Sequence, residues 1–155
     1  MKVLEVFGVR VEMPGNQPIV LLREVDGDRY LPIWVGTAEA AAIAFAQQGI
    51  QASRPLTHDL ITLILNVLDH SLEKLVISEL KDGIFHAELV LNGGISISAR
   101  PSDGIALALK VSAPIFCEEG ILDNAGIEIE ETVDSEEQVE RFREFLKNIT
   151  PEDFS

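Results

Sequence analysis

Four tight-turn sequences divide much of the chain into apolar runs of strand length. The turns are Pro14-Gly15-Asn16, Asp26-Gly27-Asp28, Lys81-Asp82-Gly83 and Asn92-Gly93-Gly94. Gly, Asn and Asp tolerate the positive φ angles that hairpin turns require. The runs beside these turns are rich in Val, Ile and Leu, which predicts strands over residues 2–12, 18–25, 29–35, 72–80, 84–91 and 95–99. Because hairpin turns join antiparallel neighbours, we expect a largely antiparallel sheet.

Helical patterns alternate with these strands. Thr37 opens a predicted helix that runs to about Gln48 and ends at Gly49. Thr57 is expected to cap a second helix over residues 59–69, and Ser102 a third over 104–111. We also expect a short strand over 114–117, one helical turn over 120–126 and an amphipathic helix over 135–148. The sequence thus predicts the α+β class: a single compact domain with a mostly antiparallel mixed sheet packed with helices, and a C-terminal amphipathic helix. We expect the domain to occupy residues 1–130, followed by an acidic helix and tail over 131–155.

The composition limits the function classes. The chain has 155 residues and a net charge of −14, of which residues 118–155 carry −10. Nucleic-acid phosphates would be repelled by this charge unless the main body concentrates its arginines locally. A single cysteine excludes an intrachain disulfide and fits a reducing compartment. With no apparent signal peptide or spanning segment, we expect a cytoplasmic protein without a membrane partner.

Two similar segments are candidates for an anion site. Residues 54–60 read Arg-Pro-Leu-Thr-His-Asp-Leu and residues 100–105 read Arg-Pro-Ser-Asp-Gly-Ile. Capping and dipole stabilisation explain the Ser, Thr and Asp residues but leave Arg54 and Arg100 unexplained, because a cation opposes a helix N-terminus. Each arginine either pairs with a nearby carboxylate or binds an anion. If the two helix starts converge, Arg54 and Arg100 would bind one phosphodiester.

Three carboxylates lie at predicted helix starts. Glu39, Asp59 and Asp103 either stabilise their own helices or together hold Mg²⁺ or Mn²⁺ through oxygen ligands. His58, beside Asp59, is a candidate general base or merely a hydrogen-bonded side chain. We therefore place His58, Asp59 and Asp103 in the catalytic set, with Glu39, Asp59 and Asp103 as metal ligands.

The sequence lacks the common motifs of nucleotide-binding proteins, serine hydrolases and zinc sites. There is no P-loop, G-x-G-x-x-G or G-x-S-x-G motif, and the histidines lack zinc-ligand spacing. Cys117 follows an apolar run and is expected to be a partly buried strand residue rather than a nucleophile.

Four blocks of the sequence match a known family in order and spacing. They are Arg29 to Gly36 with Glu39-Ala40, Arg54 to Leu60, Asp82 to Ala87, and Ala99 to Ala108. In these blocks the chain resembles the bifunctional nuclease domain family and looks like a bacterial, actinobacterial-type member. Gly104 departs from the family pattern, which usually has Ala there. The resemblance covers residues 1–130 and implies a compact α+β nuclease that acts on DNA and RNA and self-associates.

Two functions remain open from the sequence. The first is metal-assisted hydrolysis of phosphodiester bonds in DNA or RNA. The second is a non-catalytic module that binds a small anion or a partner protein, which the acidic surface favours. The apolar run over 31–34 and the apolar third helix also indicate a subunit interface in a homodimer or higher homo-oligomer.

Overall fold

The computed structural model describes residues 1–12 and 15–128. Within them, eight strands form one sheet in the order β6-β5-β4-β7-β1-β2-β3-β8. Neighbouring strands are antiparallel except β4 and β7, which run parallel. This confirms the α+β class and the mostly antiparallel mixed sheet. The helix predicted over 135–148 lies outside the described residues.

The hairpin turns produce most of the strand pairing. The strands are β1 (Lys2–Glu12), β2 (Gln17–Glu24), β3 (Arg29–Trp34), β4 (Leu72–Lys81), β5 (Ile84–Leu91), β6 (Ser96–Ala99), β7 (Ile115–Cys117) and β8 (Ile127–Glu128). Asp82, Gly83, Gly93 and Gly94 all adopt positive φ in the turns that join β4, β5 and β6. The sequence did not predict β8, a two-residue strand that pairs with the start of β3.

A bulge in β1 resolves an irregular pattern in its sequence. Leu4, Val9 and Val11 are buried, although Leu4 and Val9 lie an odd number of residues apart. The register against β2 shifts between Val6 and Gly8. This shift inserts one extra residue and returns the later apolar side chains to the core face.

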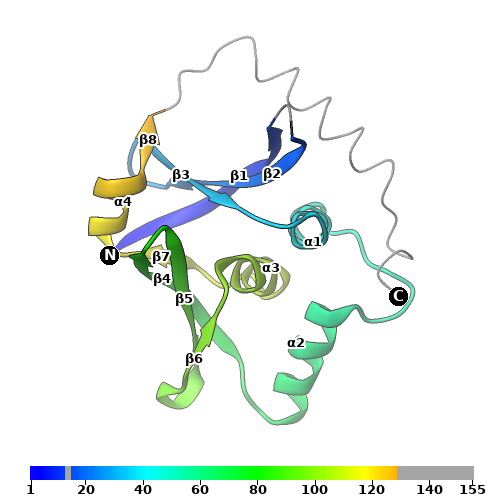
Figure 1. The fold of residues 1–155 in the computed structure, drawn as a ribbon. Helices are drawn as coiled ribbons and strands as arrows, with labels where there is room; N and C mark the ends of the chain where they lie inside the picture. Colours follow the sequence, from blue (N-terminus) through cyan, green and yellow to red (C-terminus); the bar gives the residue numbers. More distant parts are fainter. Residues whose placement is uncertain (13–14, 129–155) are drawn as a thin grey trace.

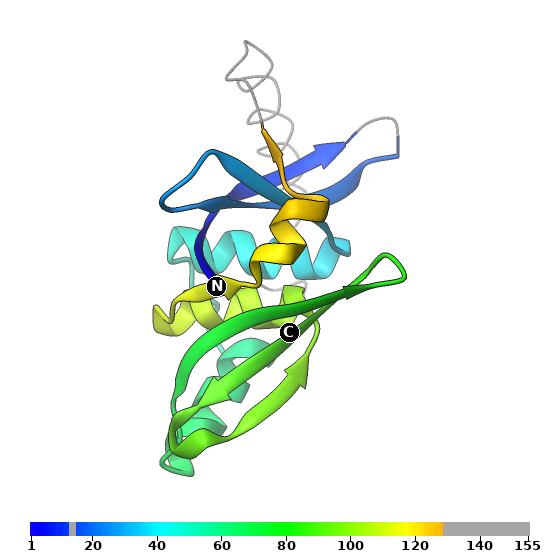
Figure 2. The ribbon, with the colours of Figure 1, turned by 90° about the vertical axis from the view of Figure 1, so that its left-hand side faces the viewer.

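The four α-helices of the described residues are α1 (Thr37–Gln48), α2 (Thr57–Val67), α3 (Pro101–Val111) and α4 (Glu119–Ala125), and a short 3-10 helix covers Asn92–Gly94. Figures 1 and 2 show the sheet bent into two wings with α3 between them. In the same views α1 lies against the wing of β1, β2 and β3, whereas α2 lies beside the wing of β4, β5 and β6. This arrangement brings the starts of α1, α2 and α3 toward one region of the molecule.

Helix α3 forms the centre of the core. Its residues Ile105, Ala106, Leu107 and Ala108 belong to the buried cluster that also contains Leu31 of β3. Neither α3 nor Leu31 is thus available as the subunit interface that the sequence suggested, although Trp34, at the end of β3, is exposed. The apolar character of α3 reflects its position inside the domain.

The N-cap residues of α2 and α3 differ from those that the sequence predicted. Helix α2 begins at Thr57 with Leu56 as its N-cap residue, and α3 begins at Pro101 with Arg100 as its N-cap residue. Neither Thr57 nor Ser102 is therefore the capping residue that we predicted. For α3 the reason is that Pro101 occupies the first helical position, where its missing N–H costs nothing.

Candidate functional site

A pocket of about 690 Å³ lies between α1, α2, α3 and the β5–β6 hairpin. Most of its lining is aliphatic, including Ile61 and Leu65 of α2 and Ile97 of β6. Six ionisable side chains near the helix starts and along α3 also line it: Glu39, His58, Asp59, Arg100, Asp103 and Lys110. The pocket therefore combines an apolar interior with one cluster of charged groups.

Asp103 is the centre of this cluster. The Nε2 atom of His58 lies 3.0 Å from Asp103 Oδ1. The second carboxylate oxygen, Oδ2, accepts a hydrogen bond of 3.0 Å from Nε of Arg100. One carboxylate thus contacts both a histidine from α2 and an arginine at the start of α3.

Arg100 also contacts the first turn of α1. Its Nη1 atom lies 3.3 Å from Glu39 Oε1, and its Nη2 atom lies 2.9 Å from Asp103 Oδ2. Hydrogen bonding to Asp103, followed by the charges of Asp103 and Glu39, raises the pKa of Arg100. The Arg100 side chain nevertheless remains 66% exposed. It joins two helix starts and still presents part of its guanidinium to the pocket and to solvent.

Asp59 belongs to a separate ion pair. Its Oδ1 atom lies 2.6 Å from Nζ of Lys110, and its Oδ2 atom accepts a hydrogen bond of 3.0 Å from the backbone N–H of Leu56. Burial opposes ionisation of Asp59, but the hydrogen bonds from Lys110 and Leu56 outweigh it and lower its pKa. Asp59 therefore accepts a backbone hydrogen bond at the start of α2 and connects that helix to the end of α3 through Lys110.

Sequence reasoning missed Lys110. A signal for it was present, because Asp103, Leu107 and Lys110 are spaced i, i+4, i+7 and so share one face of α3. That face lines the pocket. The spacing does not show, however, that this face of an almost wholly apolar helix is the one that lines a pocket.

Arg54 is placed differently from Arg100. It lies in the loop between α1 and α2, and it is not among the side chains that line the pocket. In the described part of the chain, Arg54 is exposed and makes no hydrogen bond or ion pair. The structure thus brings Arg100 to the pocket with Glu39, His58, Asp59 and Asp103, while binding of one phosphate by both arginines stays a prediction.

The three predicted metal ligands form ion pairs with two different basic side chains. Glu39 and Asp103 both contact Arg100, whereas Asp59 contacts Lys110. Among residues 1–12 and 15–128, no three His, Cys, Asp or Glu side chains form a ligand group. Of the three predicted metal ligands, Glu39 and Asp103 are therefore the two that contact the same residue, Arg100.

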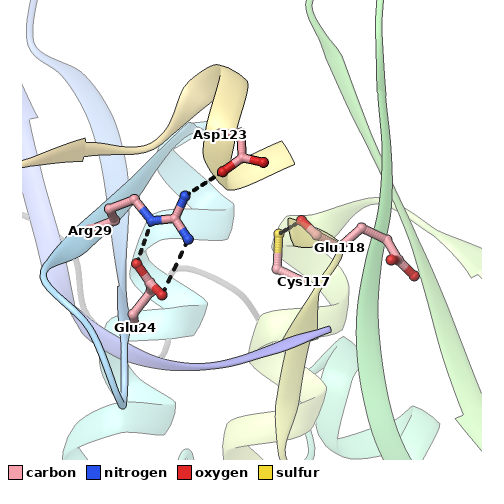
Figure 3. Close-up of polar contacts among 5 residues, drawn as sticks. All are labelled: Glu24, Arg29, Cys117, Glu118 and Asp123. Atoms are coloured by element: carbon pink, nitrogen blue, oxygen red, sulfur yellow. Dashed lines mark hydrogen bonds and ion pairs between the residues drawn. The ribbon is translucent and has the colours of Figure 1, made fainter. Parts of the chain in front are cut away.

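Cys117 lies away from this pocket, in β7. Figure 3 shows its thiol directed toward the backbone of Glu118, and the Sγ atom lies 3.4 Å from the Glu118 carbonyl oxygen. The side chain is buried, and burial raises the pKa of the thiol to about 12. A thiol in this environment is not a nucleophile at neutral pH.

Comparison with known proteins supports the family resemblance. The family described as Bifunctional nuclease domain matches residues 20–130 of the chain. This chain belongs to the bifunctional nuclease domain family. The matched range includes all six ionisable pocket residues and ends just beyond β8.

Relatives of this family member are found in bacteria and plants. An uncharacterized protein of Mycobacterium tuberculosis is 50% identical over 158 aligned positions, which cover 97% of this chain and 96% of the mycobacterial protein. Bifunctional nuclease 1 of Oryza sativa subsp. japonica is 25% identical over 130 aligned positions. That alignment covers 80% of this chain but only 39% of the rice protein. In the part of the chain that the structure describes, no helix is both long and apolar enough to cross a membrane.

Proposed function

We propose that this chain hydrolyses phosphodiester bonds in DNA and RNA at the pocket between the starts of α1, α2 and α3. Membership of the bifunctional nuclease domain family supports the reaction class. The observation that carries the proposed site is the contact of Asp103 with both His58 and Arg100. These three side chains provide a proton acceptor, a residue that orients it, and a cation for the phosphate.

His58 is the proposed general base. When its Nε2–H donates to Asp103, the imidazole is held in the tautomer whose Nδ1 atom is free to accept a proton. A water molecule that loses its proton to Nδ1 would attack phosphorus. The P–O bond to the leaving nucleotide then breaks, and the departing oxygen takes a proton from solvent in the open pocket. Asp103 keeps the imidazole oriented.

Arg100 is the proposed phosphate ligand. A guanidinium has five N–H donors, and the contacts with Asp103 and Glu39 leave part of this exposed side chain available. Its positive charge would stabilise the negative charge that develops on the phosphate oxygens during attack. Glu39 and Asp103 hold the guanidinium at the pocket edge before substrate arrives, which reduces the cost of ordering it.

A divalent cation is a further part of the proposal. Glu39 and Asp103 are the oxygen ligands to which Mg²⁺ or Mn²⁺ would bind, in competition with Arg100. A bound cation would add charge stabilisation at the phosphate. We expect EDTA to abolish cleavage and added Mg²⁺ or Mn²⁺ to restore it. Full activity in EDTA would remove the metal from the proposal and leave the roles of His58 and Arg100 intact.

The central test is cleavage of labelled single- and double-stranded DNA and RNA by purified protein. We expect His58→Gln to lower kcat by roughly 10²- to 10⁴-fold, the usual contribution of a general base. His86→Gln is the matched control, because His86 is an exposed histidine of β5 that does not line the pocket. Equal activity of wild type and His58→Gln would show that the reaction does not depend on this histidine.

The two arginines are tested separately. We expect Arg100→Ala to reduce cleavage strongly. If Arg54 also binds the phosphate, Arg54→Ala reduces cleavage and the double variant loses more than either single variant. An Arg54→Ala protein with wild-type kinetics would confine phosphate binding to Arg100.

The net charge of −14 supports a second candidate, a non-catalytic module that binds a small anion or a partner. Both candidates predict that Arg100 binds an anion, but only hydrolysis predicts turnover. Binding of a nucleotide or oligonucleotide without cleavage, lost in Arg100→Ala, would favour the non-catalytic module. A cytoplasmic location and homo-oligomer formation, both expected from the sequence, also belong to the proposal.

A further inference from the structure

Lys110 is a charged pocket residue to which the proposed reaction gives no role. It lies in the last turn of α3, and its Nζ atom is 2.6 Å from Asp59 Oδ1. Among residues 1–12 and 15–128 it forms no other ion pair. Its side chain is only 18% exposed, whereas that of Arg100 is 66% exposed. A lysine so enclosed and already paired is poorly placed to bind a substrate phosphate, so its function depends on the contact with Asp59.

This contact joins α3 to the turn that carries His58. Asp59 follows His58 directly in the first turn of α2. Its Oδ2 atom accepts a hydrogen bond from the backbone N–H of Leu56, so the carboxylate is held by its own helix as well as by Lys110. The ion pair therefore holds the backbone beside His58 against α3.

Helix α2 has little apolar burial with which to fix its position. None of its residues is buried. In the described part of the chain, Ile61 is the α2 side chain that packs, partly buried, against the core cluster. Most helices in proteins are held by the packing of an apolar face. A helix with so little of that packing depends more strongly on its polar contacts.

Two polar contacts attach the first turn of α2 to separate points on α3. The Nε2 atom of His58 lies 3.0 Å from Asp103 Oδ1, and Asp59 pairs with Lys110. Asp103 and Lys110 are seven residues apart, which is about 10 Å along a helix. A single contact would leave the turn free to rotate about it, whereas two separated contacts fix its orientation.

We propose that Lys110 is a positioning residue for His58. By pairing with Asp59, it holds the first turn of α2 in the orientation in which the imidazole meets Asp103. This inference rests on the proposed role of His58 as the general base. Removal of the Lys110 charge leaves the imidazole with one contact in place of two, and the ring then loses its fixed orientation.

The first experiment observes the His58 ring without substrate, so it does not depend on nuclease activity. In long-range proton–nitrogen NMR spectra at alkaline pH, where an imidazole is neutral, we expect wild-type His58 to hold its proton on Nε2. Lys110→Met should give a mixture of the two tautomers. Lys110→Arg keeps the charge that pairs with Asp59 and should retain the wild-type pattern.

Lys74→Met is the matched control for this spectrum. Lys74 is also half-buried, but it lies in β4 and does not line the pocket, so its loss should leave the His58 tautomer unchanged. A mixture of tautomers already in wild type, or the wild-type pattern in Lys110→Met, would overturn the proposal.

The second experiment is the kinetics of cleavage. We expect Lys110→Met to lower kcat by up to about 10²-fold with little change in KM, because a misplaced general base impairs the reaction rather than binding. A raised KM with unchanged kcat would indicate that Lys110 binds the substrate directly. A lower urea midpoint with unchanged kcat would indicate a role in stability alone. Either of these two results would overturn the proposal.

The double variant Asp59→Asn/Lys110→Met tests whether the two residues act through their ion pair. If they do, the double variant loses no more activity than the more affected single variant. Losses that multiply would show that the two residues act independently and would contradict the proposal. Full activity of His58→Gln would remove the proposed function, whereas the NMR spectra would still decide whether Lys110 positions the ring.

Discussion

Asp59 and Asp103 are each the third residue of a helix, yet they have different partners. Asp103 lies three residues after Arg100, which is the N-cap residue, so the arginine folds back onto the carboxylate. Asp59 lies five residues after Arg54, which precedes the N-cap residue Leu56 by two positions. Two additional residues between the proline and the aspartate therefore move Arg54 out of reach of the helix start. Instead, Lys110 of α3 neutralises Asp59.

Gly104 is a residue whose identity packing explains. A Cβ at this position would lie 2.4 Å from Cδ1 of Leu75, a side chain that is fully buried in the core. An added methyl would therefore force the buried Leu75 side chain to change its conformation or α3 to shift. This contact accounts for the absence of a side chain at position 104.

We predict that Gly104→Ala lowers the free energy of unfolding by about 1–2 kcal/mol. Overpacking of a core costs roughly 1–3 kcal/mol, and the better helix propensity of Ala offsets part of it. Urea denaturation measures the change. Gly120→Ala in α4 is the control, because a Cβ there meets no atom within 4 Å. Equal stability of both variants and wild type would contradict the packing explanation.

At the scale of elements, the C-terminal ends of α1 and α3 show which features of a helix end can be predicted from the sequence. Gly49 ends α1 in the left-handed conformation, with φ of 70°, as the sequence predicted. Ser112 has the same role at the end of α3, with φ of 58°, although a side chain disfavours this conformation. The sequence predicted that α3 ends at residue 111, but not that Ser112 adopts the left-handed conformation there.

These two caps lead to opposite predictions. Gly49→Ala should lower the free energy of unfolding by about 1 kcal/mol, since Ala must adopt a positive φ there. Ser112→Gly should raise it by roughly 0.5–1 kcal/mol for the same reason. Thermal and urea denaturation of both variants test the pair. If the free energy of unfolding changed in the same direction in both variants, backbone conformation could not be the main cause of the two changes.

At the scale of the whole molecule, Arg29 joins separate parts of the fold through a buried carboxylate and an exposed one. Figure 3 shows Arg29 of β3 between Glu24 of β2 and Asp123 of α4. The Nε atom of Arg29 donates to Glu24 Oε1 at 2.6 Å, and Glu24 is almost completely buried. This hydrogen bond lowers the pKa of Glu24 despite the opposing effect of burial. A Cβ at Gly27 would lie 2.7 Å from a Glu24 carboxylate oxygen, so this glycine leaves room for the carboxylate.

The depressed pKa of Glu24 predicts a specific acid sensitivity. Its contribution to stability is complete above the ordinary value of 4.5 and is lost as pH falls from there through the lower pKa of the folded state. We expect Glu24→Gln to reduce the urea midpoint at pH 7 and to differ less from wild type at pH 3. Glu88→Gln, at an exposed site on β5, should change neither midpoint appreciably. A difference between wild type and Glu24→Gln that grows as pH falls would contradict this assignment.

The sequence by itself determined the features that depend on near neighbours. Turn residues define the β4–β5 hairpin, and Gly49 defines the end of α1, because a residue's φ preference acts locally. The pattern of strands and turns was also sufficient to predict the α+β class. The family motifs identified the segments that contain Glu39, His58, Arg100 and Asp103, but not the contacts among them.

Only the tertiary structure decided which of these residues meet. Contacts of Asp103 with His58 and of Asp59 with Lys110 join residues 45 and 51 positions apart, and no local rule relates them. Likewise, both α2 and α3 have apolar faces in the sequence, yet α3 is central to the core, whereas several aliphatic side chains of α2 are exposed: Leu60, Leu63, Ile64 and Val67. Hydrophobicity shows that a face must be covered, whereas the positions of the other elements determine whether this chain covers it.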